Sequence, residues 1–364
     1  MIYGVVSDIH ANNWSVFSST NSDGVNSRLR IILNELLRAA QTVKAAGGNT
    51  LICAGDILHT RGSIDPEVLN PVRDTFKQIL ALGVSVYAIP GNHDLKSKDS
   101  RELSSAIQNL AEISLEGTEF RVFNEPTVIE IEGQIFGFVP WRHTREELLA
   151  DLTNMSALRI AAAQMDVFIH AGIDGVLSGM PAHGLTEDVL AAFGFRHVFS
   201  GHYHHHKVMK GGVVSIGATT HQVWGDVNTK AGFLTVDSKT GAVTWHDSMA
   251  PKFVDISGLD ELEMEAECLN SYVRFRGPAM LQSQITELRE QLRKWGALGT
   301  SIEVPKASAA TRPTADPAKA RSLPESVDAY VRGSTTIPAH VDKDRVAARA
   351  AEVLQNTLTV FEEA

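Results

Sequence analysis

Several apolar segments of this chain share one construction: each reads as a buried strand and is followed by side chains that can bind a metal ion. In the clearest case, residues 84–89 alternate as a strand does and lead into Pro90-Gly91-Asn92-His93-Asp94. Sites in open α/β sheets lie at the carboxyl ends of the strands, so residues that follow such strands are expected at one edge. The construction recurs at Asp8 and His10, at Asp56 and His59, at His170, and at His202 and His204.

The two-residue spacing within two of these pairs brings their side chains together. Alternate residues of an extended segment point to the same side, so Asp8 and His10 can reach one ion. His202 and His204 repeat this spacing. Gly55 permits a tight turn that would let the Asp56 carboxylate lie between two ions. A capping aspartate with an incidental histidine would explain one such pair alone.

The order of the predicted elements indicates an α/β fold. Strands at residues 2–6, 50–54 and 84–89 are separated by helical patterns that begin near residues 27 and 66. This rhythm implies a mostly parallel sheet with right-handed crossovers.

A second sheet is predicted further along the chain. Residues 213–216, 232–236 and 242–246 have the pattern of antiparallel strands, and residues 145–165 have that of a helix. We therefore predict a two-sheet sandwich flanked by helices over residues 1–250.

The pattern changes after residue 250. Residues 251–302 combine strand-like segments with a helix and predict a small α+β module. Residues 303–323 are rich in Pro, Ala, Ser, Thr and Lys without periodicity, which is typical of a flexible linker. Residues 324–364 regain a helical pattern. A short helical pair buries its apolar stripe poorly, so we predict that this tail docks on a partner protein.

Composition limits the class of protein. The formal charge of -10 argues against binding nucleic acid through overall basic character, although a local basic path or a cluster of cations could still meet phosphate. Cys53 and Cys268 are the two cysteines, so we expect no disulfide framework and a reducing, cytoplasmic compartment. Apolar stretches stay shorter than ~18 residues and the start lacks a basic region, so neither membrane spanning nor secretion is expected.

The candidate ligands predict a two-metal site. They offer carboxylate oxygen, amide oxygen and imidazole nitrogen, a mixture that suits Mn, Fe or Zn ions better than a structural zinc. One shared carboxylate would divide them into two sites of about four ligands, and ions ~3.5 to 4 Å apart can activate water for phosphate-ester hydrolysis without a protein nucleophile. The seven ligands are Asp8, His10, Asp56, Asn92, His170, His202 and His204.

Three further residues are candidates for catalysis. His93 follows a ligand and would act as general acid, or as a cation beside the leaving oxygen, with Asp94 fixing its tautomer; the alternative is a hydrogen-bonded supporting histidine. His59 could face the substrate or simply cap the following turn. His205 and His206 are read as solvated, and His221 is expected near the rim of the site.

Together these motifs resemble those of the calcineurin-like metallophosphoesterase superfamily. Asp8-Ile9-His10, Gly55-Asp56, Gly91-Asn92-His93-Asp94, His170 and Gly201-His202-Tyr203-His204 follow the family's order over roughly the first 205 residues. Within the superfamily the chain is similar to SbcD-type nucleases, especially the phage recombination nuclease subunits. The closer resemblance rests on His59, Pro140-Trp141, Ile216-Gly217-Ala218, Trp224-Gly225-Asp226 and Lys230-Ala231-Gly232-Phe233.

The resemblance implies a Mn²⁺-dependent DNA exonuclease and endonuclease, with Mg²⁺, Fe²⁺ or Zn²⁺ as alternative ions. It also implies a homodimer that works with an SbcC-like ABC ATPase in DNA recombination, repair or degradation. Residues 251–302 and 324–364 lie where that family has its DNA-capping domain and its ATPase-binding helices. One ion would be held by Asp8, His10, Asp56 and His204, the other by Asp56, Asn92, His170 and His202, with His93 and His59 as catalytic imidazoles.

The chain departs from the family pattern in places. The loop that begins Ala11-Asn12-Asn13-Trp14 is longer and more polar than the common form, and Ala218 stands where Pro is frequent. These departures concern loop shape and substrate range rather than the metal ligands.

Two other functions fit the same residues less well. A phosphatase or cyclic-nucleotide phosphodiesterase on this scaffold would give no reason for the small module and the helical tail, and Ser/Thr phosphatases usually carry Arg at the place of Pro90. A non-catalytic scaffold should have lost ligands, and all seven are present.

Overall fold

The computed structural model describes residues 1–96, 106–158, 162–305, 322–334, 337–338 and 341–362, with side chains up to residue 354. The chain divides into two compact units, Met1–Pro305 and Lys306–Ala364. In the described ranges every helix is too short or too polar to span a membrane. Cys53 and Cys268 are both buried and free. The predicted linker, residues 303–323, falls mostly on residues 306–321, which are outside the described ranges.

The first unit, as far as it is described, is built on two large sheets. In the first sheet β1 (Ile2–Val6), β2 (Thr50–Ala54) and β3 (Ser85–Ile89) lie side by side and parallel, as predicted. The order of this sheet is β13 (Ala242–Asp247), β12 (Gly232–Asp237), β1, β2, β3, β5 (Thr118–Val122) and β4 (Ser114–Leu115). The order of the second sheet is β10 (Lys207–Val208), β11 (Val213–Ser215), β9 (His197–Gly201), β8 (Met165–His170), β7 (Gln134–Val139) and β6 (Thr127–Ile131).

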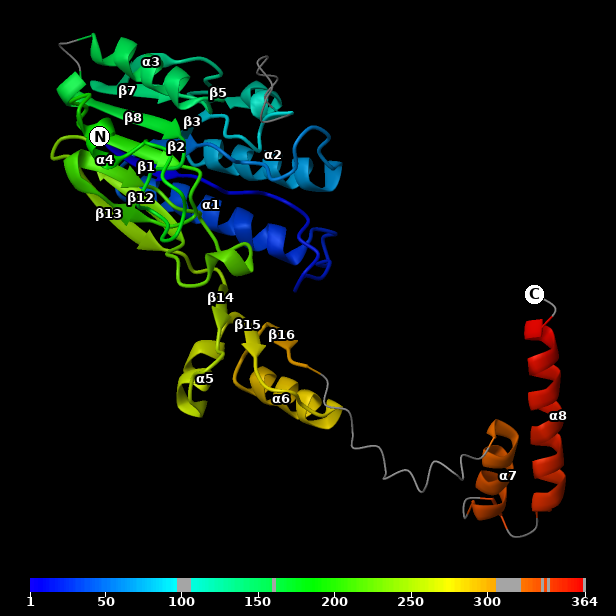
Figure 1. Ribbon diagram of the computed structural model, residues 1–364. Coiled ribbons are helices and arrows are strands. Elements are labelled where there is room, and N and C mark those ends of the chain that lie inside the picture. The colour runs from blue at the N-terminus through cyan, green and yellow to red at the C-terminus, as the bar shows by residue number, and fades with distance from the viewer. Residues whose placement is uncertain (97–105, 159–161, 306–321, 335–336, 339–340, 363–364) are drawn as a thin grey trace. The chain divides into compact units, whose positions relative to one another are not determined.

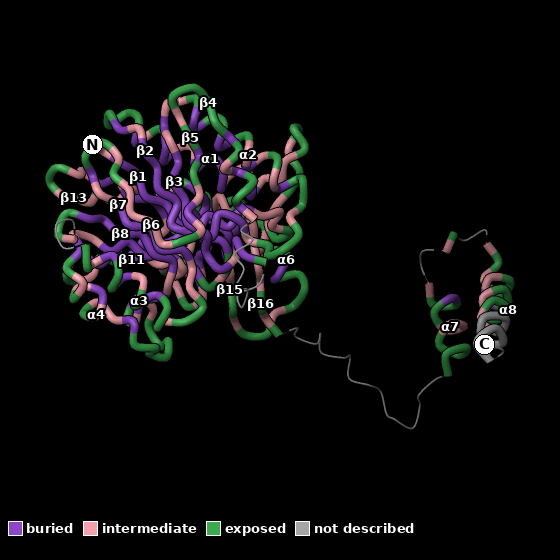
Figure 2. The backbone as a smooth tube through the Cα atoms, turned by 90° about the horizontal axis from the view of Figure 1, so that it is seen from above, coloured by how far each residue is buried: buried purple, intermediate pink, exposed green. Residues whose placement is uncertain are grey.

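The two sheets face each other across an aromatic core. The ring of Tyr3 on β1 lies 5.0 Å from that of Phe136 on β7 and 6.3 Å from that of Phe168 on β8, measured between centroids. The helices α1 (Ser27–Ala45) and α2 (Pro66–Ala81) pack on the outer face of the first sheet, and α3 (Arg145–Ser156) and α4 (Glu187–Ala191) pack on that of the second (Figure 1). Figure 2 shows that central strands such as β2 and β8 are buried, whereas the edge strands β4 and β13 and many of the loops are exposed or partly exposed. The predicted two-sheet sandwich flanked by helices is therefore confirmed.

Local sequence signals explain where the helices begin. The side chain of Asn26 accepts hydrogen bonds from the backbone N–H groups of Arg28 and Leu29 and caps α1. Asp65 caps α2, whose first residue is Pro66. Thr144 and Glu147 form a capping box at the start of α3.

The assignment of strands to sheets was partly wrong. β12 and β13 were expected in the second sheet, but β12 pairs antiparallel with β1 in the first sheet and β13 pairs with β12. β11 does lie in the second sheet, parallel to β9. An alternating pattern identifies a strand, but the edge that it joins depends on contacts between distant segments. The helix expected over residues 145–165 ends at Ser156, and Met165 instead begins β8 by pairing with Ile135 of β7.

Beyond the sandwich, residues 252–303 form a small α+β module, called the cap below. Its strands β14 (Lys252–Asp255), β15 (Ser271–Arg276) and β16 (Gly299–Glu303) are parallel, and α5 (Glu261–Cys268) and α6 (Gln282–Lys294) connect them. The cap has its own core, which includes Ile256, Val273 and Leu292. β16 was not expected, because its sequence Gly-Thr-Ser-Ile-Glu contains one large apolar residue.

The second unit is helical in its described part, as predicted. α7 (Leu323–Gly333) starts with a capping box of Ser322 and Glu325, and α8 (Lys343–Glu362) packs along it. Val331 is buried, whereas the Tyr330 side chain is 76% exposed. Short 3-10 turns complete the described elements: η1 (Ala106–Glu112), η2 (Ala162–Gln164), η3 (Lys210–Gly212) and η4 (Trp224–Asp226).

A buried carboxylate joins the two sheets. Asp166, near the start of β8, accepts hydrogen bonds from the hydroxyl of Tyr3, the guanidinium of Arg196 and Nδ1 of His197. Burial alone would raise the pKa of Asp166, but these partners hold that pKa below its usual value. The charged form of Asp166 is therefore part of the folded structure.

Replacement of this carboxylate should destabilise the fold. We expect Asp166→Asn to lower the free energy of unfolding by about 3 kcal/mol at pH 7, because Arg196 then lacks its charged partner. The folded pKa lies below the unfolded value of about 3.9, so the contribution is complete above that pH and is lost as the pH falls through the folded pKa. Urea unfolding from pH 7 to pH 3 should show the difference between the two proteins shrinking.

The matched control is Asp74→Asn, which breaks an exposed ion pair with Lys77. Its unfolding midpoint should equal that of the wild type. Equal midpoints for Asp166→Asn and the wild type would contradict the prediction.

Candidate metal centre

The predicted ligands all lie at strand ends on one edge of the sandwich. Asp8 and His10 follow β1, Asp56 follows β2 and Asn92 follows β3 of the first sheet. His170 ends β8, and His202 and His204 follow β9 of the second sheet. The edge is thus formed by the carboxyl ends of parallel strands from both sheets, where ligand sites of α/β proteins are usual.

The structure groups these side chains around Asp56. Potential ligand atoms of Asp8, His10 and His204 lie within 4.8 Å of one another, and so do those of Asp56, His170 and His202. Asp56 Oδ2 is 3.5 Å from His10 Nε2 and 3.3 Å from His170 Nε2. Asp56 Oδ1 accepts a hydrogen bond of 2.8 Å from the backbone N–H of His93. The backbone of His93 therefore fixes Oδ1 of Asp56. Oδ2 lies between His10 of one group and His170 of the other, as expected of a carboxylate that bridges two ions.

Asn92 adds an amide to the second group. Its Oδ1 is 3.0 Å from His202 Nδ1, and its backbone carbonyl accepts a hydrogen bond of 3.0 Å from Arg61 Nε. Arg61 thus holds the turn that presents Asn92 to His202.

The backbone at these strand ends is strained. Asp8, His10, Asp56 and His202 have φ angles of 50°, 47°, 55° and 93°. Side-chain residues rarely adopt such angles, and the strain persists only where the surrounding structure imposes it. Backbone strain at four candidate ligands together indicates a functional constraint rather than a structural one.

Hydrogen bonds also orient two of the imidazoles. Nδ1 of His170 donates to the Ala54 carbonyl at 2.8 Å, and Nδ1 of His204 donates to Asp226 Oδ1 at 2.9 Å. In each ring Nε2 is then the atom available to an ion. Nε2 of His170 is buried and has no hydrogen-bond partner among the described residues.

The pKa values in the cluster are shifted by burial and by the opposite charges of neighbouring side chains. Burial would lower the pKa of His170, but the carboxylates of Asp56 and Asp8 raise it to about 9. Burial would raise the pKa of Asp56, but His170 and His10 hold it far below its usual value. Burial lowers the pKa of His202 to about 3, with His170 adding to the effect. Burial raises the pKa of Asp8, so this acid, like Asp56, needs nearby positive charge to stay ionised.

The residues present fit divalent cations. Buried carboxylates need cations or partners, and the donor set of carboxylate, amide and neutral imidazole is one that borderline transition metals prefer. Nε2 of His170 points to the same conclusion, because it is buried, meets no hydrogen-bond partner with good geometry among the described residues and lies 3.3 Å from the Asp56 carboxylate. The cluster can therefore bind metal ions.

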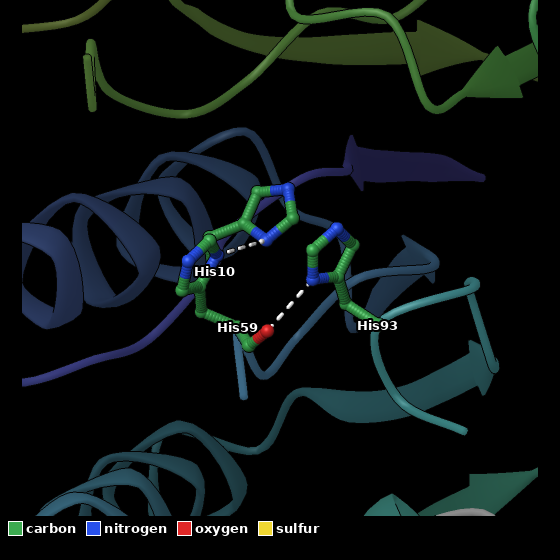
Figure 3. A group of neighbouring side chains, drawn as sticks. All are labelled: His10, His59 and His93. Carbon is green, nitrogen blue, oxygen red and sulfur yellow. Dashed lines mark hydrogen bonds between the residues drawn. The ribbon is translucent and has the colours of Figure 1, made fainter. Parts of the chain in front are cut away.

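His59 and His93 form a second layer on this edge. Their rings stack at 5.1 Å, and Nδ1 of His59 is 3.3 Å from Nδ1 of His10 (Figure 3). Nδ1 of His93 donates a hydrogen bond of 2.7 Å to the His59 carbonyl, which leaves Nε2 of His93 without that constraint. His59 therefore faces the cluster instead of capping the following turn.

The expected role of Asp94 requires a correction. Its buried carboxylate accepts hydrogen bonds from the backbone N–H groups of Gly91 and Leu58, both at 2.9 Å, and of Ile57 at 3.3 Å. The tautomer of His93 is set instead by the carbonyl of His59. Asp94 thus joins the two ligand-bearing turns through their backbone N–H groups.

Other residues of the site were missed or misread. Asp226 orients His204, and Gln222 donates from Nε2 to the carbonyls of Asp8 at 2.8 Å and Ile9 at 3.3 Å. The Trp224-Gly225-Asp226 motif was a signal for Asp226, but nothing in the sequence marks Gln222, because the carbonyls that its side chain contacts lie over two hundred positions away. His221, expected at the rim, accepts a hydrogen bond at Nδ1 from the backbone of Phe253 and so links the sandwich to β14.

Comparisons with known proteins agree with this geometry. A family model described as calcineurin-like phosphoesterase matches residues 1–206. The chain is also similar to "Exonuclease subunit 1" of Enterobacteria phage T4, with 23% identity over 334 residues that cover 87% of this chain and 89% of the relative.

Solved structures give a weaker likeness. A dimetal phosphatase from Danio rerio has 13% identity and a TM-score of 0.41, covering 65% of this chain and 91% of its own. The nuclease MPE of Pseudomonas putida has 19% identity and a TM-score of 0.25, covering 58% of this chain and 66% of its own. Scores this low say nothing about a shared function.

Loss of Asp226 should weaken metal binding. We expect Asp226→Ala to bind Mn²⁺ about 10- to 100-fold more weakly than the wild type, because His204 loses the partner that orients its ring. Isothermal titration calorimetry at pH 7.5 measures the affinity.

The control is Asp74→Ala, which removes an exposed carboxylate that pairs with Lys77 on α2. Its Mn²⁺ affinity should match that of the wild type. If Asp226→Ala also bound Mn²⁺ with wild-type affinity, the orienting role of Asp226 would be disproved.

Proposed function

The chain belongs to the calcineurin-like phosphoesterase family, and from that premise we propose that it is a nuclease subunit that hydrolyses DNA phosphodiester bonds by a two-metal mechanism. The observation that carries the proposal is the position of Asp56 Oδ2 between His10 and His170. The similarity to a phage exonuclease subunit over 87% of the chain supports DNA as the substrate.

In this proposal the seven ligands divide as the geometry groups them. Asp8, His10 and His204 would hold one ion, and His170, His202 and Asn92 the other, with Asp56 shared. When bound, two such cations polarise a phosphate and lower the pKa of a water molecule between them. Mn²⁺ is the ion that we propose, because the donor set mixes oxygen with imidazole nitrogen.

The chain's own contribution to catalysis lies in the histidine pair. Because Nδ1 of His93 is engaged by the His59 carbonyl, its Nε2 is available to hold a proton at the leaving oxygen. The backbone N–H of His93 is bonded to Asp56, so this imidazole keeps a fixed place relative to the bridging carboxylate. His59 stacks on His93 and limits its rotation.

A partner subunit is part of the proposal. We infer that an SbcC-like ATPase binds the helical unit, since the T4 relative is named a subunit and Tyr330 and Val353 expose apolar surface on α7 and α8. A homodimer in the cytoplasm is proposed with it, on the resemblance alone.

A second candidate is a phosphatase or cyclic-nucleotide phosphodiesterase on the same scaffold. The cluster itself would serve either reaction, because both attack phosphorus. The cap and the helical unit favour the nuclease, since a small phosphate ester needs neither. Cleavage of linear duplex DNA, compared with turnover of p-nitrophenyl phosphate and bis-p-nitrophenyl phosphate, separates the two.

Removal of the imidazole of His93 should abolish cleavage without loss of metal. We expect His93→Ala to lower kcat on bis-p-nitrophenyl phosphate by at least about 100-fold, because the leaving oxygen loses its proton donor. Its Mn²⁺ affinity should be unchanged in calorimetry. His246→Ala, which alters a histidine of β13 that is hydrogen-bonded to Thr235, serves as the control and should keep wild-type kcat. A concurrent loss of Mn²⁺ binding would show that His93 is a ligand instead.

Deletion of the helical unit should separate basal from stimulated activity. Without residues 324–364 the protein should still cleave single-stranded DNA, because the metal cluster lies in the first unit. Stimulation by the ATPase partner and ATP should be lost. Tyr330→Asp, which charges an exposed ring, should weaken stimulation in the same direction. Unchanged stimulation of the deletion variant would refute the docking role.

A further inference from the structure

The loop of residues 12–26 touches the candidate catalytic histidines at one point and the cap at another. The ring of Trp14 lies 4.5 Å from that of His59. Three residues later, the ring of Phe17 stacks on Tyr272 of β15 at 5.2 Å with an interplanar angle of 12°. This loop is the one whose sequence departs from the family pattern by being longer and more polar. It lies between the cap and the histidines.

Phe17 is tightly seated in the cap. Its backbone has a φ of 58°, which a residue with a side chain rarely adopts. A Cβ atom at Gly299 of β16 would lie 2.3 Å from the Phe17 ring, so only glycine leaves room for it. Trp224 and Phe253 complete the seat, with ring centroids 5.9 and 6.2 Å from that of Phe17. The strained backbone and the close fit fix the loop to the cap.

Arg28 contacts both the loop and the cap. It is 4% exposed, and its guanidinium lies 5.1 Å from the ring centroids of both Trp14 and Phe253 and 5.4 Å from that of Tyr272. No carboxylate of the described residues forms an ion pair with it. It stands in the first turn of α1, where the helix dipole disfavours a cation. The aromatic faces and backbone carbonyls stabilise this charge at short range, and the carboxylate of Asp226 adds a longer-range attraction.

The carbonyl partners of Arg28 extend the connection to a ligand. The guanidinium donates to the carbonyls of Val16 at 3.2 Å and Gln222 at 2.6 Å. The side chain of Gln222 in turn donates to the carbonyl of Asp8. One buried cation thus contacts the cap, the loop and the segment that holds the backbone of Asp8.

We propose that Trp14 is a positioning residue that holds His59 against His93, and that the cap keeps Trp14 in place through Arg28 and Phe17. The inference rests on the proposed phosphodiesterase function, in which these two histidines act. Displacement of the cap would move Trp14 and loosen the stacked imidazoles. The position of the cap therefore sets the rate of hydrolysis even for a substrate too small to contact the cap.

The test measures hydrolysis of bis-p-nitrophenyl phosphate with Mn²⁺ by the full-length protein. Trp14→Ala and, in the cap, Tyr272→Ala should each lower kcat about tenfold or more, because small misplacements of catalytic groups are costly. KM and Mn²⁺ affinity should stay at wild-type values. Trp14→Phe and Tyr272→Phe, which keep a ring, should retain most of the activity. Val16→Ala, in the same loop and 52% exposed, is the matched control and should equal the wild type.

A second readout does not depend on activity. In protein labelled with ¹³C-histidine, the ring signal of His59 should shift in Tyr272→Ala, because the Trp14 ring above it moves. If Tyr272→Ala fails to fold, Arg28→Lys replaces it, since lysine keeps the charge but loses the planar face, and the same fall in kcat is expected.

The outcomes distinguish the two proposals. A wild-type protein that does not hydrolyse the ester would defeat the proposed function itself. An active wild type with Trp14→Ala or a cap variant at wild-type kcat would overturn the positioning role. A rise in KM at constant kcat would overturn it as well, because it would indicate substrate contact instead.

Discussion

The burial of two carboxylates at strand ends is the constraint on which the rest of this structure depends. Asp8 and Asp56 are 0% and 2% exposed, and unpaired buried carboxylates are costly in free energy. Two histidines beside Asp56, His10 and His170, and a backbone N–H to one of its oxygens offset part of that cost. Divalent cations would supply the remaining positive charge. A cluster of this kind is stable only where the framework around it resists collapse.

The sandwich provides that framework. Parallel strands from both sheets end at the same edge, and their aromatic core and the Asp166 cluster hold the sheets in register. Rigid strands can impose the left-handed backbone seen at Asp8, His10, Asp56 and His202, which a flexible loop would relax. The strained backbone angles orient the ligand side chains, and the stability of the sheets offsets the free energy of this strain.

A buried charge also connects the cap to the loop of residues 12–26. Arg28 is buried among aromatic rings and forms no ion pair with a described carboxylate, although Asp226 attracts it from a longer distance, and it joins three segments that are far apart in the sequence. A buried cation tolerates little displacement, because any movement away from its aromatic faces and carbonyls exposes an uncompensated charge. The cost of an uncompensated buried charge therefore constrains both the metal ligands and the connection between the cap and the candidate catalytic histidines.

The sequence by itself determined the parallel strands, the sandwich and the set of candidate ligands, because alternation and the residues after each strand are local signals. His10, Asp56 and His170 could be found in this way before any contact was known. Only the tertiary structure decided that β12 joins β1, that the His59 carbonyl engages His93 while Asp94 binds backbone donors, and that Gln222 and Arg28 reach the site. These facts depend on contacts between residues distant in sequence, and a pattern along the chain carries no information about which distant groups will meet.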